Sequence, residues 1–294
     1  MQEPHHRYHK TRIAPTPSGF LHLGNVLSFA ITAALAQNHG AKILLRIDDL
    51  DRARVTKPYV QDIFDTLDFL EIPWHEGPRN IKEFEESYSQ LHRMGSYNVA
   101  LRQLADSGLV YACTCSRSRL LNVNHCDCFE QRIPLYTPDV SWRLLTGGNT
   151  NCTLKGYNAA ITKTVLPVEM VNFIVKKKDG FPAYQLTSVV DDVFYGVDLI
   201  VRGEDLWGST LAQHVLASAL GEDGFNRITF YHHPLLMEAN GSKLSKSAGA
   251  TSVKYLRENG KSAKAVYSII AAMMGFDEMV DDWEQLATII GQKR

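Results

Sequence analysis

The sequence lacks the features that mark membrane-spanning and secreted proteins. No apolar run reaches the roughly 18 residues needed to cross a bilayer. The first ten residues, MQEPHHRYHK, are polar and contain no apolar core of a signal peptide. There are only five cysteines, four of them in one short cluster, which disfavours a secreted disulfide framework. We therefore expect a cytoplasmic protein with no membrane partner, whose residues 1–10 form a flexible tail.

The chain also lacks a strong net charge. With 31 basic and 32 acidic residues, it carries a net charge of −1 and has a pI near 6.8. This balance disfavours broad non-specific binding to nucleic acids, because such binding needs many cations. There is no internal repeat and no low-complexity stretch. The 294 residues, of which 45% are hydrophobic, predict one large or two modest globular domains.

The stretch TRIAPTPSGFLHLGN (11–25) predicts a short strand, a tight turn and the start of a helix. The apolar run VLSFAITAALAQNHG (26–40) continues that helix. Such a layout presents backbone N–H groups and the positive end of a helix to phosphate. His22, Gly24 and Asn25 are the candidate phosphate-binding residues of the turn. An ordinary strand-to-helix connection would look the same over these fifteen residues alone.

Apolar strands and helical patterns alternate along much of the remaining chain. AKILLRI (41–47) and VDLIV (197–201) are typical of buried parallel strands. The other expected elements are helices over about 58–71, 84–107 and 209–220, a hairpin over 171–190, a strand over 228–237 and helices after 247. This order predicts an α/β fold with a parallel sheet, in which ligand sites lie at the carboxyl ends of the strands.

Two pairs of cysteines stand in a turn-rich stretch without a helical period. They are Cys113 and Cys115, then Cys126 and Cys128. Two close pairs joined by a loop suit tetrahedral Zn²⁺, although the pairs are tighter than the usual Cys-x-x-Cys. Reduced structural cysteines are the alternative interpretation, and His125 is a possible substitute ligand.

Charged and polar side chains collect at the predicted strand ends and in the adjoining loops. They are Arg12 and Arg202, which suit a carboxylate; Asp48 and Tyr184, which suit an ammonium group; and Lys243 and Lys246, which suit a polyphosphate. A carboxylate clamp combined with cations for ATP phosphates is what adenylation of a carboxylic acid requires. Catalysis would then rest on positioning and charge neutralisation, with Mg²⁺ bridging the phosphates.

Six segments of the chain resemble, in the same order, the motifs of one enzyme family. They are HLGN (22–25), RIDDLD (46–51), WHEGP (74–78), DGFPAYQLTSVVDD (179–192), LIVRGEDL (199–206) and KLSKS (243–247). The first and last resemble the two signatures of class I aminoacyl-tRNA synthetases, and the others resemble the glutamyl-tRNA synthetase catalytic domain. The resemblance spans roughly residues 11–247 and implies a Rossmann-type parallel sheet.

The resemblance also implies a domain organisation. Residues 11–108 and 184–247 would form two halves of the catalytic domain, and 109–183 would be an inserted α+β segment similar to an acceptor-binding region. Only 294 − 247 = 47 residues follow KLSKS, so 248–294 would be a short helical segment in place of an anticodon-binding domain. In this respect the chain resembles glutamyl-queuosine tRNA(Asp) synthetases, which activate glutamate without tRNA and transfer it to the queuosine base of tRNA(Asp). Asn25, at the second histidine of the first signature, fits that subfamily, and we expect a monomer.

Two other functions stay open at this point. One is a truncated glutamyl-tRNA synthetase that charges the 3′ end of a tRNA. The other is a synthetase-like protein that has lost catalysis and binds a nucleotide or a partner. The presence of Arg12, His22, Lys243 and Lys246 argues against the last interpretation, and Asp48 is the main feature in its favour.

Individual roles follow only from the resemblance. It implies that Arg12, Thr16, Tyr184 and Arg202 contact glutamate, that His22, Gly24 and Asn25 contact ATP, and that Lys246, with Lys243 beside it, stabilises the departing pyrophosphate.

Two departures from the family pattern stand out. The subfamily uses three cysteines and a tyrosine where this chain offers four cysteines. Asp48 stands where the family has the glutamate that faces the substrate amino group. A tighter pocket, a bridging water or the absence of this contact would each accommodate the shorter side chain. Loss of the contact would cost about 1.5–3 kcal/mol of binding.

Overall fold

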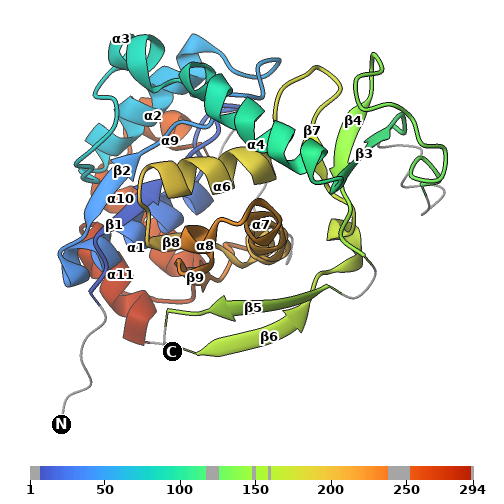
Figure 1. Ribbon diagram of the computed structural model, residues 1–294. Coiled ribbons are helices and arrows are strands. Elements are labelled where there is room, and N and C mark those ends of the chain that lie inside the picture. The colour runs from blue at the N-terminus through green and yellow to red at the C-terminus, as the bar shows by residue number, and fades with distance from the viewer. Residues whose placement is uncertain (1–6, 117–125, 148–149, 158–159, 238–251, 293–294) are drawn as a thin grey trace. The chain divides into compact units, whose positions relative to one another are not determined.

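The computed structural model describes residues 7–116, 126–147, 150–157, 160–237 and 252–292 (Figure 1). The chain divides into two compact units. Unit 1 comprises Met1–His92, Val197–Asp205 and Phe230–Arg294, and unit 2 comprises Arg93–Gly196 and Leu206–Thr229. Among the described residues, no helix is long and apolar enough to cross a membrane.

Unit 1 is built on short strands whose residues are mostly buried. Its strands are β1 (Lys10–Ile13), β2 (Lys42–Leu45), β8 (Leu199–Gly203) and β9 (Thr229–His233). β1 and β2 pair in parallel, with Arg12 opposite Leu44, and β8 pairs with β9. β8 meets the other side of β1, where the Asp198 N–H donates to the Lys10 carbonyl at 3.0 Å. The continuous apolar runs expected at 41–47 and 197–201 thus form the buried strands that the sequence predicts.

Unit 1 also contains helices and short helical turns. They are α1 (Leu23–His39), α2 (Lys57–Phe69), α3 (Ile81–Glu83), the π-helical turn Phe84–Tyr88, the 3-10 turns Gln90–Arg93 and Glu204–Leu206, α9 (Val253–Glu258), α10 (Ala263–Met273) and α11 (Trp283–Gln292). The last helices belong to the same unit: α11 packs against α1, and the Tyr267 hydroxyl donates to the Leu70 carbonyl at 2.6 Å. The C-terminal helices therefore complete the core around α1 and α2.

Unit 2 combines an antiparallel sheet with helices. Its elements are α4 (Met94–Asp106), β3 (Val110–Cys113), β4 (Ser141–Leu144), β5 (Asn151–Lys155), β6 (Ile161–Val165), the 3-10 turn Val168–Met170, β7 (Ile174–Lys176), α6 (Tyr184–Phe194), α7 (Trp207–Leu220) and α8 (Asp223–Asn226). The strand order β3-β4-β7 forms one sheet, and β5 and β6 form a separate hairpin. The buried Asp191 carboxylate joins α6 to α4, because it accepts from Arg93 at 2.8 and 2.9 Å and from the Tyr97 hydroxyl at 2.7 Å.

The prediction of a long helix over about 84–107 is wrong for the first half of that range. The chain forms a π-helical turn, an extended residue at Ser89 and a 3-10 turn before α4 begins at Met94. The break has a polar cause: the Ser89 hydroxyl and the Gln90 N–H both donate to the buried Asp49 carboxylate, at 2.7 and 2.8 Å. A continuous helix would commit the Gln90 amide to its own backbone ladder.

The hairpin expected over 171–190 is also only partly correct. β7 and the turn at Gly180 are present, but a single bridge between Lys176 and Pro182 stands in place of the second strand. The chain then enters α6 at Tyr184, because Leu186 and Val189 recur at helical spacing and bury one face of the helix.

Candidate functional site

The turn between β1 and α1 leads into a helix N-terminus that is capped by its own residues. His22 caps α1: its Nδ1 accepts the Gly24 N–H at 3.1 Å, and the Asn25 side-chain oxygen accepts the His22 N–H at 3.0 Å. A side chain on Gly24 would press on the imidazole ring, since its Cβ would lie 3.0 Å from two ring atoms. Because Nδ1 is an acceptor, the neutral ring carries its proton on Nε2 and can donate it to an oxygen.

Two buried guanidinium groups lie on neighbouring strands at the end of the sheet that carries this turn. Arg12, on β1, and Arg202, on β8, are 6% and 4% exposed. Arg12 donates to the carbonyl of Val201 at 3.2 Å, which places it beside the backbone that carries Arg202. Arg202 also lies over the Phe230 ring, 5.1 Å from its centre. Cations buried this deeply are suited to a carboxylate ligand.

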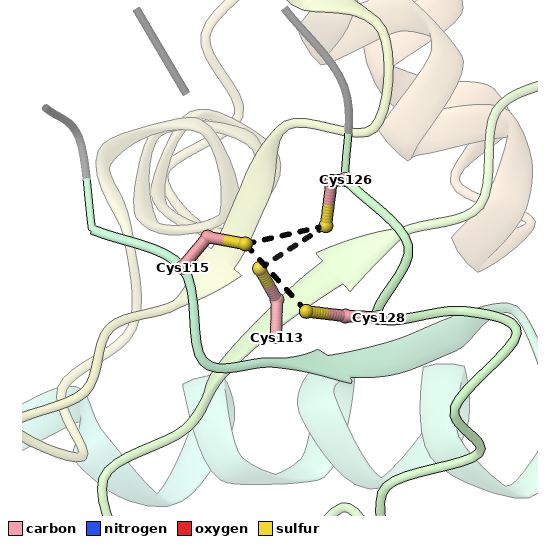
Figure 2. A group of neighbouring side chains, drawn as sticks. All are labelled: Cys113, Cys115, Cys126 and Cys128. Carbon is pink, nitrogen blue, oxygen red and sulfur yellow. Dashed lines mark hydrogen bonds between the residues drawn. The ribbon is translucent and has the colours of Figure 1, made fainter. Parts of the chain in front are cut away.

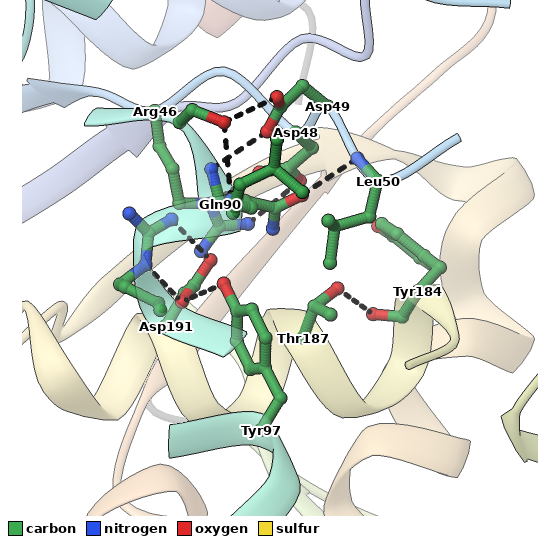
Figure 3. A network of polar contacts seen from close by, with 12 residues as sticks. Arg46, Asp48, Asp49, Leu50, Gln90, Tyr97, Tyr184, Thr187 and Asp191 are labelled. Atoms are coloured by element: carbon green, nitrogen blue, oxygen red, sulfur yellow. Dashed lines mark hydrogen bonds and ion pairs between the residues drawn. The ribbon is translucent and has the colours of Figure 1, made fainter. Parts of the chain in front are cut away.

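Asp48 follows β2 and is held by a buried arginine. Arg46 donates to both carboxylate oxygens, at 2.7 and 3.1 Å, and the two side chains are 2% and 7% exposed (Figure 3). Residues two apart in an extended segment point the same way, so the sequence RID itself brings the pair together. An ammonium ligand at Asp48 would therefore share the carboxylate with Arg46.

The next residue, Asp49, organises the loop after β2. Its buried carboxylate pairs with Arg52 at 2.7 Å and accepts hydrogen bonds from Ser89 and Gln90. The side chain of Gln90 in turn accepts the Leu50 N–H at 3.3 Å (Figure 3). These contacts engage Asp49 in holding the loop that comes after Asp48.

The remaining predicted glutamate and ATP residues are placed as follows. Thr16 is half-buried in the turn of unit 1, where its carbonyl accepts the Ser18 N–H at 2.8 Å. Tyr184 belongs to unit 2, begins α6 and is 41% exposed; its carbonyl accepts from the Thr187 hydroxyl at 3.1 Å. Lys243 and Lys246 lie outside the described residues. All the other predicted residues of this set belong to the described part of unit 1, at or just after strand ends or at the start of α1; they are Arg12, Thr16, His22, Gly24, Asn25, Asp48 and Arg202.

The four clustered cysteines converge in unit 2, as their spacing predicts. Their sulfur atoms all lie within 4.8 Å of one another, and Figure 2 shows the side chains pointing inward from β3 and the loop after it. The hydrogen-bonded sulfur pairs are 3.5, 3.6 and 3.7 Å apart. Four sulfurs placed about 2.3 Å from a tetrahedral Zn²⁺ are about 3.8 Å apart. The donor set and its dimensions therefore fit zinc, and the spacing is too long for disulfides.

The protonation of the cluster is uneven. Burial raises the pKa of Cys126 to about 12. Burial acts in the same direction at Cys128, but hydrogen bonds from the Thr114 backbone and hydroxyl outweigh it and lower the pKa of Cys128 to about 6. Coordination of a metal ion by a thiol with a raised pKa, such as Cys126, would release its proton.

Some residues of the site carry no motif signal of their own. Arg46 was detectable, because strand alternation places it beside Asp48. Ser89 and Gln90 were not, because their partner lies about forty residues earlier in the chain. His232 was also missed: burial, Arg202 and His233 lower the pKa of His232 to about 3, so its ring is neutral near pH 7.

Comparison with known proteins gives a consistent result. The family profile described as tRNA synthetases class I (E and Q), catalytic domain, matches residues 9–132 and 157–288. The chain is 33% identical over 275 residues to the glutamyl-Q tRNA(Asp) synthetase of Synechococcus sp. (strain CC9605), a match that covers 90% of this chain and 82% of that protein. It is 32% identical over 288 residues to the glutamate–tRNA ligase of Methylobacillus flagellatus, with 90% of this chain and 57% of the relative covered. The chain thus spans just over half the length of that ligase.

A solved structure supports the same fold. The glutamate–tRNA synthetase of Elizabethkingia anophelis superposes with a TM-score of 0.71 at 21% identity, covering 96% of this chain and 65% of that one. The α/β fold predicted from the strand and helix order, with its inserted cysteine-bearing segment, is confirmed.

Proposed function

The chain belongs to the family of class I tRNA synthetases for glutamate and glutamine, and we propose that it activates glutamate with ATP without requiring tRNA. The product would be glutamyl-adenylate, and the glutamyl group would then pass to the queuosine base of tRNA(Asp). The observation that carries the first step is the pair of buried guanidinium groups, Arg12 and Arg202, beside the capped start of α1.

The chemistry of activation needs no protein nucleophile. A carboxylate oxygen of glutamate attacks the α-phosphorus of ATP, and pyrophosphate leaves. Arg12 and Arg202 would hold substrate carboxylate charge, while Asp48, which is held by Arg46, would receive the ammonium group. Such a site accelerates the reaction by orienting the oxygen for attack.

His22 would serve the nucleotide. The cap on α1 fixes its Nδ1 as an acceptor, so Nε2–H is the donor offered to a phosphate oxygen, with Gly24 and Asn25 shaping the same turn. Lys243 and Lys246 would neutralise pyrophosphate as it departs. The segment that carries these lysines rejoins the described chain at Ser252, which bridges to His22. We expect Mg²⁺ to enter bound to the phosphates of ATP.

Zinc would be held by Cys113, Cys115, Cys126 and Cys128. A closed four-thiolate set is typical of a structural site, and zinc there would tie the loop after β3 to the sheet. We propose, with this, that residues 109–183 are an insertion between catalytic halves at 11–108 and 184–247. Residues 248–294 would be a helical C-terminal segment, and the protein a cytoplasmic monomer. The flexible tail expected over 1–10 is wrong for its last residues, because Tyr8 is buried, the His9 N–H donates to the Asp198 carboxylate and Lys10 begins β1.

Similarity to known proteins supports both candidate acceptors of the glutamyl group, the queuosine base and the 3′ end of a tRNA. The glutamyl-Q tRNA(Asp) synthetase of Synechococcus is matched over most of its length, which favours queuosine. Glutamate–tRNA ligases match at similar identity but over 55–57% of their length, which keeps charging of a tRNA 3′ end as the second candidate.

Transfer of labelled glutamate separates the two candidates. The protein, ATP and labelled glutamate are incubated with tRNA(Asp) that either carries or lacks queuosine, and with the same tRNAs shortened by the 3′-terminal nucleotide. We expect labelling that requires queuosine and survives the 3′ truncation. Labelling that ignores queuosine and is lost on truncation would establish charging of the 3′ end instead.

A further inference from the structure

The peptide that precedes His22 is clamped from two sides. The Leu21 N–H donates to Oδ2 of Asp62, on α2, at 2.8 Å. The Leu21 carbonyl accepts from the Val253 N–H, at the start of α9, also at 2.8 Å. Leu21, Asp62 and Val253 are all buried, with 4%, 2% and 0% exposure. Two helices that lie far apart in the sequence thus hold the same residue.

A buried carboxyl is an energetically costly acceptor for the Leu21 N–H. Its second oxygen, Oδ1, is buried and has no hydrogen-bond partner among the described residues. Burial raises the pKa of Asp62, and nearby Asp65 adds to the rise, while the Leu21 hydrogen bond and the charges of Arg257 and Lys254 oppose it. An asparagine would offer Leu21 the same acceptor without a buried charge. The contact to Leu21 therefore needs the acceptor oxygen and not the charge.

The clamped backbone determines the direction of the His22 ring. The His22 amide donates to Asn25 and its ring accepts from Gly24, so the imidazole follows the backbone of residues 21–25 as one piece. If either contact to Leu21 is removed, the backbone can rotate there, and the ring rotates with it.

We propose that Asp62 and the Val253 amide are positioning groups that aim His22 Nε2–H at the phosphates of ATP. This role rests on the proposed function, since it assumes that ATP binds at His22. The clamp also joins the His22 turn to α9, which begins next to the Ser252 bridge. Both groups act through the backbone and touch no substrate.

The first test replaces the carboxyl. Asp62→Leu keeps the shape but removes the acceptor, and Asp62→Asn keeps an acceptor of the same reach. In glutamate-dependent ATP–pyrophosphate exchange we expect kcat to fall about 10- to 100-fold for Asp62→Leu, with the KM for ATP changed far less. Asp62→Asn should restore kcat to within about threefold and should be at least as stable as the wild type, because it removes a buried charge. Asp68→Asn, exposed on the same helix, is the matched control.

The second test removes the other half of the clamp and leaves Asp62 in place. Val253 is the first residue of α9, where proline is tolerated, and Ser252 has φ −72° and ψ 142°, which a following proline allows. Val253→Pro deletes the N–H donor, whereas Val253→Ala shortens the side chain and keeps the donor. We expect Val253→Pro to lower kcat at least about tenfold relative to Val253→Ala. This variant decides the matter if Asp62→Leu does not fold.

Two measurements independent of activity complete the design. Hydrogen exchange of the Leu21 amide should be slow in the wild type and in Asp62→Asn, and fast in Asp62→Leu. Nitrogen NMR should show His22 as a single Nε2–H tautomer in the wild type and mixed tautomers in Asp62→Leu. Variants that keep the wild-type kcat, or a Leu21 amide that exchanges equally fast in all proteins, would overturn the positioning role. A wild type without glutamate-dependent exchange would overturn the proposed function instead, and Leu21 exchange would still report on the clamp.

Discussion

Arg46→Met should destabilise the protein more than any surface charge change, because it leaves Asp48 buried without its bidentate partner. The guanidinium and the carboxylate are 2% and 7% exposed and are joined by bonds of 2.7 and 3.1 Å. Methionine has similar length and no charge, so the packing of the stem is largely kept. Breaking a buried pair by removing one member costs about 3–5 kcal/mol, much of it the penalty for the charge left behind.

The assay is urea unfolding near pH 7.5, read as a shift in the midpoint at constant slope. The double variant Arg46→Met/Asp48→Asn should be more stable than Arg46→Met alone, because it removes the buried charge that has lost its bidentate partner. Arg54→Met is the matched control: Arg54 pairs with Asp51 at the surface, with 64% and 35% exposure, so its loss should cost about 0–1 kcal/mol. If Arg46→Met costs no more than Arg54→Met, or if the double variant costs the sum of its single changes, the reasoning is refuted.

Three further changes test other parts of the structure. The pKa of Glu76 is lowered chiefly by its hydrogen bond from Lys10, so Glu76→Gln should cost about 0.2–1 kcal/mol near neutral pH. In urea unfolding across pH, this difference should begin to shrink as the pH falls below the ordinary pKa of 4.5, and it should vanish only below the lowered pKa of the folded state. Gly77→Ala should cost at least about 1–3 kcal/mol in the same assay, because the residue has φ +100° and a Cβ would overlap a carbonyl oxygen of β2. Cys115→Ser should lower the melting temperature and should reduce bound zinc, measured by metal analysis, to below about half an equivalent. Cys152 is a buried cysteine outside the cluster, so Cys152→Ser should leave the zinc content unchanged.

Local patterns in the sequence predicted the elements that local chemistry decides. The β1–α1 turn follows from its polar turn residues and the apolar run behind it, and the meeting of the four thiols follows from their spacing. Metal binding by these thiols stays a prediction. The break between Tyr88 and Met94 could not be predicted, because it is caused by Asp49 about forty residues earlier.

A strong turn signal was misleading in one place. Lys178, Asp179 and Gly180 correctly predicted a turn, yet the helical spacing of Leu186 and Val189 was the better guide to the segment after that turn. The Leu21 clamp illustrates the general difficulty. Asp62 and Val253 carry no motif, and only the packing of α2 and α9 brings them to one residue.

The central claim, activation of glutamate at the Arg12–Arg202 site, is tested most directly by ATP–pyrophosphate exchange without RNA. The protein is incubated with ATP, Mg²⁺ and labelled pyrophosphate, with glutamate, glutamine, aspartate or no amino acid. We predict labelled ATP with glutamate alone, and its loss in Arg202→Ala at a glutamate concentration that saturates the wild type. No exchange at high glutamate, or equal exchange with glutamine, would contradict the account.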